Sequence, residues 1–122
     1  MRLPLNVHLA RMTEMSQDLS RKRDIQRYFT HLSQMNPQLF INMLFTVSEH
    51  SARIYLGEID TPTLVIAGEK DHFTPASISI EMAELLPNAQ LQIIPDGTHA
   101  APVEHTIEVN QLIRRFIDQC LI

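Results

Sequence analysis

Hydrophobic residues recur at two different spacings along this chain, and the change of spacing divides it into two parts. Up to residue 55 they recur every three or four positions, which is typical of amphipathic helices. Asn36 and Pro37 predict the N-cap and first residue of one such helix, and Gly57 predicts its stop. The first part should therefore be helical, with apolar stripes at Leu5, Leu9, Met12 and Leu19 and at Ile25, Tyr28, Phe29 and Leu32. One face of a third helix should carry Leu39, Phe40, Met43, Leu44, Val47, Ser51 and Ile54.

A strand pattern begins after Gly57. Residues 63–67 are apolar on both faces, as in a buried parallel strand. A helix starting with Thr74 as N-cap and Pro75 as its first residue, a second strand over 90–94 and a last amphipathic helix over 103–117 follow. This order predicts a parallel pair joined by a right-handed crossover. Because two strands make a marginal sheet in water, we expect the end of a larger α/β protein.

Composition narrows the class of protein and of partner. With 44% hydrophobic and 20% charged residues among 122, the chain has a globular composition, which excludes disordered and low-complexity classes. A net charge of -4 argues against nucleic acid and anionic membranes as partners. The longest apolar run, 64–67, is too short for a membrane span, and polar residues interrupt the first ten positions, as they would not in an export signal. The single Cys120 cannot form an internal disulfide and is expected to be a small buried hydrophobe, so we expect a cytoplasmic protein.

An acid and a histidine follow the two expected strands. Asp71 lies in the loop after the first strand and His99 in the loop after the second. Since the carboxyl ends of parallel neighbours meet at one sheet edge, the two side chains should come within hydrogen-bond reach. A carboxylate that holds an imidazole is the base half of a nucleophilic triad. The structural alternatives are an Asp71 that caps a helix or braces a turn, and a surface His99 at a helix start.

The remaining reactive residues form no recognisable site. The six histidines lack metal-ligand spacing, so we expect neither a metal nor a cofactor. His72 neighbours the acid, but adjacent side chains in a loop point apart, and we leave it out of the site.

Two segments carry a family resemblance. Residues 61–71, TPTLVIAGEKD, with Pro75 beyond, resemble the acid-bearing strand and loop of the α/β-hydrolase family, and Gly97-Thr98-His99 with Glu104 resembles that family's histidine loop. The resemblance covers residues 56–118. It implies that Asp71 is the triad acid and His99 the triad base, with residues 1–55 similar to the helical cap and return helix and residues 56–122 to the C-terminal part of the core. Thr98 between the glycine and the histidine, and Thr106 where a proline is common, depart from the pattern.

One part of the family's machinery is missing from this sequence. Family members carry a serine on a G-x-S-x-G elbow, and no two of the three glycines here are four residues apart. The resemblance thus implies the C-terminal half of a hydrolase of ester, thioester or similar acyl bonds on small molecules, inactive alone and expected to self-associate or to pair with the missing N-terminal half. The alternative is a non-catalytic remnant or interaction module that dimerises or docks on a partner.

Overall fold

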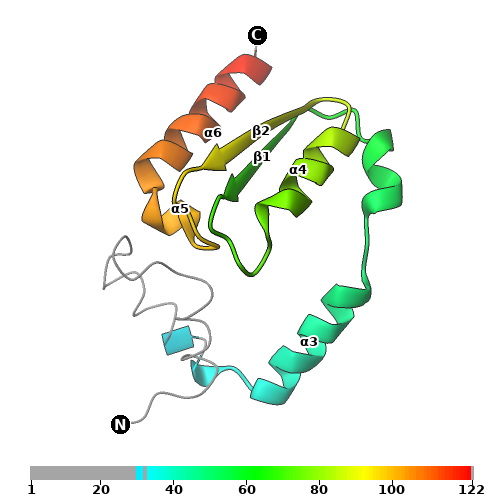
Figure 1. Cartoon of the computed structure of the whole chain (residues 1–122), viewed down its shortest axis with the longest axis vertical. Coiled ribbons are helices and arrows are strands. Elements are labelled where there is room, and N and C mark those ends of the chain that lie inside the picture. The colour runs from blue at the N-terminus through cyan, green and yellow to red at the C-terminus, as the bar shows by residue number, and fades with distance from the viewer. Residues whose placement is uncertain (1–29, 32, 122) are drawn as a thin grey trace.

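The structure is a computed structural model that describes residues 30–31 and 33–121. The elements are α3 (Pro37–Glu49), a 3₁₀ helix η1 (Arg53–Glu58), β1 (Thr63–Gly68), α4 (Ala76–Leu85), β2 (Ala89–Ile94), α5 (Ala101–Glu104) and α6 (Thr106–Cys120), as Figure 1 shows. The residues of the two helical stripes expected before residue 33 all lie outside the described residues. The proposed division of the chain at residues 55 and 56 stays a prediction.

The two strands form the expected parallel pair. Thr63 lies opposite Ala89, and the register runs without interruption to Gly68 opposite Ile94. Helix α4 connects the strands and packs on both of them, while α6 contacts β1, and Figure 1 shows the two helices on opposite sides of the sheet. The chain is therefore an α/β structure in which both loops that follow the strands lie at one sheet edge.

The core lies between the sheet and the C-terminal helices. Ile94, only 1% exposed, packs with the buried Ala101 and Val109, and Ile66 and Leu112 lie against this cluster. Because side chains alternate along a strand, the neighbours of Ile66 face the other side of the sheet, toward α4. Burial of β1 from both sides explains why residues 63–67 read as a continuous apolar run.

Helix α3 begins as the sequence predicts and ends earlier. The Asn36 side chain accepts hydrogen bonds from the backbone N–H groups of Gln38 (2.9 Å) and Leu39 (3.2 Å). The helix stops at Glu49, so the expectation of a continuous helix to Ile54 is wrong. The apolar spacing continues because residues 53–58 form the separate η1, whose 3₁₀ geometry places residues three apart on one face; Gly57 lies inside it rather than ending α3.

Three further expectations need correction. Helix α4 begins at Ala76 with Pro75 as its N-cap, and no side chain caps it, so Thr74 is not the cap. The last helix is broken in two at His105, which ends α5 and precedes α6. Cys120 is exposed at the end of α6 rather than buried.

No helix in the described part of the chain is long and apolar enough to cross a bilayer.

Candidate active site

A close backbone approach fixes the two loops against each other. A Cβ atom added at Gly68 would collide with the carbonyl oxygens of Gly97 and Thr98. Only a residue without a side chain fits where β1 ends beside the histidine loop. The glycine therefore sets how near the acid loop lies to the histidine loop.

Hydrogen bonds across the same junction hold that approach. The Glu69 N–H donates to the Ile94 carbonyl (3.0 Å), and the Lys70 N–H donates to the Gly97 carbonyl (2.8 Å). The Lys70 ammonium also pairs with the Asp96 carboxylate. The hydrogen bond from Lys70 and its positive charge hold the pKa of Asp96 below its usual value. Asp96 has a φ of 59°, a left-handed conformation that aspartate tolerates better than most residues, so the chain turns sharply before Gly97.

Asp71 divides its two carboxylate oxygens between two tasks. Oδ1 accepts the backbone N–H groups of Phe73 and Thr74, each at 2.8 Å, which braces the turn leading to α4. Oδ2 accepts the Thr74 hydroxyl at 2.8 Å and lies 3.0 Å from Nδ1 of His99. Asp71 therefore both braces the turn, through Oδ1, and contacts His99, through Oδ2.

The environment favours the charged form of Asp71. Its side chain is only 8% exposed, and this burial by itself would raise the pKa of the carboxyl group. Hydrogen bonds from the Thr74 N–H, the His99 ring, the Thr74 hydroxyl and the Phe73 N–H outweigh burial and lower the pKa below its ordinary value of 3.8. A carboxylate that stays ionised is the state that can hold an imidazole.

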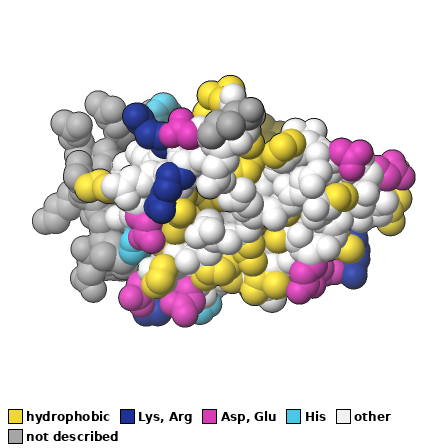
Figure 2. Space-filling model, turned by 90° about the horizontal axis from the view of Figure 1, so that it is seen from above, with side chains coloured by type: hydrophobic (Ala, Val, Ile, Leu, Met, Phe, Trp, Pro, Cys, Tyr) yellow, Lys and Arg dark blue, Asp and Glu magenta, His cyan; other side chains and the backbone are white. Residues whose placement is uncertain are grey.

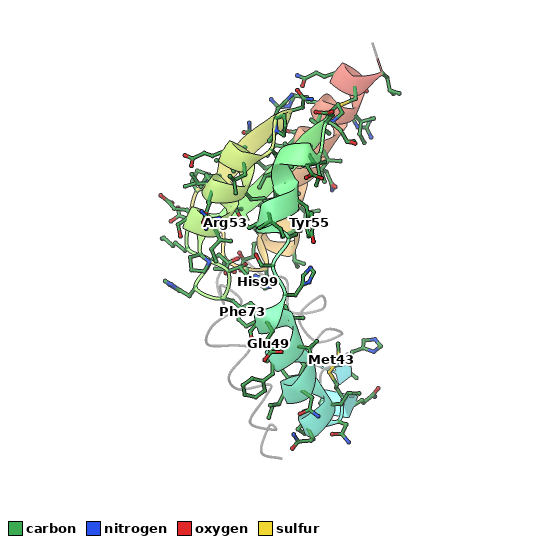
Figure 3. The ribbon with its side chains drawn as sticks, turned by 90° about the vertical axis from the view of Figure 1, so that its right-hand side faces the viewer. Met43, Glu49, Arg53, Tyr55, Phe73 and His99 are labelled. Atoms are coloured by element: carbon green, nitrogen blue, oxygen red, sulfur yellow. The ribbon has the colours of Figure 1, made fainter. Side chains whose placement is uncertain are left out.

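Asp71 and Phe73 both contact the His99 ring. Its Nδ1 faces Asp71 Oδ2, and the Phe73 ring lies edge-on to the imidazole with centroids 5.0 Å apart and an interplanar angle of 64°. Figure 3 shows Phe73 and His99 together at the end of the sheet. The His99 side chain remains 39% exposed, so this held ring can still meet a reactant from outside.

Glu104 fixes the backbone of the histidine loop. One carboxylate oxygen accepts the Thr98 N–H (3.0 Å) and the other accepts the Thr98 hydroxyl (2.8 Å). The same hydroxyl accepts the Ala100 N–H at 3.2 Å. Thr98, which departs from the family pattern, thus gives Glu104 a second donor immediately before His99.

The structure brings the two sequence-derived site residues into direct contact and adds others. Phe73 and Thr74, the two residues that follow His72, both touch His99. The spacing of Asp71 and Thr74 could have revealed the turn, because aspartate commonly accepts N–H groups two and three residues on. Nothing local reveals Phe73, because its ring meets a residue from another loop.

Within residues 30–31 and 33–121 no group of three or more His, Cys, Asp or Glu side chains could hold a metal ion. Asp71 and His99 place a carboxylate oxygen 3.0 Å from an imidazole nitrogen, an arrangement that can orient the imidazole ring.

Comparisons with known proteins match most of this chain. A family model described as alpha/beta hydrolase fold matches residues 5–106. A 2-hydroxy-6-oxononadienedioate/2-hydroxy-6-oxononatrienedioate hydrolase of Comamonas testosteroni is 30% identical over 93% of this chain and 39% of its own length. A pimeloyl-[acyl-carrier protein] methyl ester esterase of Xanthomonas oryzae is 29% identical over 80% of this chain and 39% of its own length.

A solved structure shares the fold. A serine hydrolase involved in carbazole degradation superimposes with a TM-score of 0.75 at 17% identity, over 93% of this chain and 46% of that one. The chain spans less than half of the length of these relatives, and its parallel pair with flanking helices fits the C-terminal part of their fold.

Proposed function

The chain belongs to the α/β-hydrolase fold family, and we propose that it supplies the acid and the base of a serine-hydrolase triad acting on an ester, thioester or similar acyl bond of a small molecule. The observation that carries this proposal is the 3.0 Å contact between His99 Nδ1 and Asp71 Oδ2 at the carboxyl ends of two parallel strands. The names of the relatives support it, since they are hydrolases and an ester esterase.

The proposed mechanism gives each side chain one task. Asp71 keeps the imidazole oriented and stabilises the imidazolium that forms during the reaction. Nε2 of His99 removes the proton from a serine hydroxyl as the oxygen attacks the acyl carbon, and then returns it to the leaving group. Phe73 limits the motion of the ring through its edge-on contact.

The nucleophile in this proposal comes from outside residues 1–122. No pair of glycines in the sequence has the spacing of a serine elbow. Among the described residues, β1 has a paired strand on one side only, and its composition is that of a strand buried within a sheet. We therefore propose that the open edge of β1 pairs with a serine-bearing segment. Because the lone Cys120 suits a reducing compartment, the proposed site of action is the cytoplasm.

A chimera tests this function. Replacing the matching C-terminal region of the Comamonas testosteroni hydrolase with this chain should give an enzyme that hydrolyses acyl esters. His99→Ala should lower its turnover on the order of 10⁴- to 10⁶-fold, as expected for loss of a triad base. His72→Ala, which alters the histidine next to Asp71, is the matched control and should leave turnover unchanged.

Two results would contradict the proposal. A folded chimera whose serine is accessible to a fluorophosphonate probe, yet which turns over no ester, would remove the base role of His99. The isolated chain should be inert toward p-nitrophenyl esters; turnover that disappears in His99→Ala would show that the nucleophile lies within the chain.

A second candidate function is an interaction module, and one observation favours it. Helix α3 buries none of its residues, and six of its large apolar side chains are exposed: Leu39, Ile41, Met43, Leu44, Phe45 and Val47. Figure 2 also shows hydrophobic side chains reaching the surface between charged groups. Sedimentation of the pure chain tests the self-associating form of this role, which requires a dimer or a larger assembly; a monomer contradicts that form.

A further inference from the structure

The Thr74 hydroxyl lies between the acid and the histidine. Its Oγ1 is 2.8 Å from Asp71 Oδ2 and 3.2 Å from His99 Nδ1, and those two atoms are themselves 3.0 Å apart. Helix capping does not explain this placement, because Pro75 is the N-cap of α4 and no side chain caps that helix. The hydroxyl instead joins two loops that are 25 residues apart in sequence.

The number of hydrogens on each group determines which atom donates and which accepts in each hydrogen bond. A threonine hydroxyl has a single hydrogen and two lone pairs. The ionised Asp71 Oδ2 is the closer and stronger acceptor, so that hydrogen points to it. Oγ1 then offers Nδ1 of His99 only a lone pair, as does Oδ2, and both contacts require that Nδ1 carries a proton.

We propose that Thr74 is a positioning residue whose hydroxyl, committed to Asp71, holds the neutral His99 ring in the tautomer with the proton on Nδ1. This tautomer leaves the lone pair of Nε2 available as a base. The catalytic value of the tautomer therefore rests on the proposed function, to which the inference adds a positioning residue. Without the hydroxyl, Nδ1–H keeps one acceptor instead of two, and Asp71 Oδ2 loses a donor.

The backbone of Thr74 has a separate role. Its N–H donates to Asp71 Oδ1 at 2.8 Å, a bond that any residue except proline can make. Thr74→Val keeps this bond and the branched shape of the side chain while it removes the hydroxyl. Thr74→Ser keeps both the bond and a hydroxyl. The pair of variants therefore separates the hydroxyl from the turn.

Nitrogen NMR of the full chain tests the proposal. With ¹⁵N-labelled histidine, the shifts of Nδ1 and Nε2 report which nitrogen of the neutral His99 ring holds the proton, and His99→Gln identifies its signals. In the wild type the proton should lie on Nδ1. Thr74→Val should reduce the ratio of the Nδ1–H to the Nε2–H form roughly two- to tenfold, the change expected for the loss of one ordinary hydrogen bond. Thr74→Ser should restore it.

Thr63→Val is the matched control. Its hydroxyl donates to the Thr61 carbonyl (2.9 Å), and Thr63 starts β1, at the opposite end from the two loops, so this variant should leave the His99 tautomer unchanged. Solid-state spectra give the same nitrogen shifts if the chain self-associates. A tautomer ratio that is unaffected in Thr74→Val, or that Thr74→Ser fails to restore, would overturn the proposal.

The test is independent of the proposed function. It requires neither a substrate nor a serine, so an inactive chimera together with the expected tautomer shift would refute the hydrolase role and leave the positioning role standing. An active chimera whose Thr74→Val form keeps the wild-type tautomer would support the hydrolase role and refute the positioning role of Thr74.

Discussion

The strand–helix–strand unit of residues 63–120 and helix α3 both carry apolar residues at regular spacing, yet they differ in what those residues contact. In the first, Ile94 is almost fully buried, and backbone hydrogen bonds join loops far apart in sequence. In α3 only Phe40 is partly covered and every other residue is exposed. The spacing of apolar residues thus predicts which face of an element can pack against another element, but the stability of the element depends on whether a partner covers that face.

The largest expected effect is at the junction of the two loops. Gly68→Ala should lower the free energy of unfolding by about 3 kcal/mol or more, because the new Cβ meets backbone carbonyls that cannot rotate away. It should also abolish the contact between Asp71 and His99. Gly57→Ala is the control, since the nearest atom to its Cβ is the Leu85 carbonyl oxygen at 3.9 Å. Urea unfolding compares them; equal stabilities would mean that the close approach does not hold the unit together.

A smaller loss is expected at the histidine loop. Glu104→Gln should cost about 1.5–3 kcal/mol, because it replaces a charged acceptor of two Thr98 donors by an amide that can accept only on one side. Glu108→Gln, at a half-exposed carboxylate 3.8 Å from His105 Nδ1, should cost almost nothing. Equal free energies of unfolding for the two variants would contradict the role of Glu104 in fixing the histidine loop.

Acid should loosen the strand–helix–strand unit through Asp71. The folded pKa of Asp71 lies below its ordinary 3.8, so its contribution is present above that value and is lost as the pH falls through the folded pKa. The free energy of unfolding should therefore fall on acidification below about pH 4, and less steeply in Asp71→Asn. Urea titrations on both sides of that pH check this. An unchanged slope in the variant would mean that Asp71 gains nothing from its partners.

The smallest expected effect is on α3. Phe45→Ser changes a side chain that is 68% exposed, so the free energy of unfolding should shift by less than about 0.5 kcal/mol. Self-association measured by sedimentation should weaken if α3 is a docking surface. Ile94→Ala, in the core, should instead cost about 2–5 kcal/mol. A large loss of stability in Phe45→Ser would show that α3 is packed against the rest of the chain, and would end the contrast between the two regions.

Local sequence was sufficient wherever the cause of an element is local. Asn36 caps α3 as predicted, and both strands lie within one residue of their expected bounds. The prediction failed where spacing continues through a change of geometry. Residues 53–58 extend the apolar period of α3 as a separate 3₁₀ helix, and His105 divides a stripe that reads as one helix.

The sequence by itself determined that an acid and a histidine follow parallel strands, because strand composition sets burial and a crossover connection sets direction. Only the tertiary structure decided which atoms meet. The division of Asp71 between its turn and His99, the Thr74 hydroxyl between them and the Phe73 ring beside them all depend on the register of β1 against β2 and on the contact of Gly68 with residues 97–98. Hydrogen bonds act over about 3 Å, and chain spacing alone does not position loops 25 residues apart to that precision.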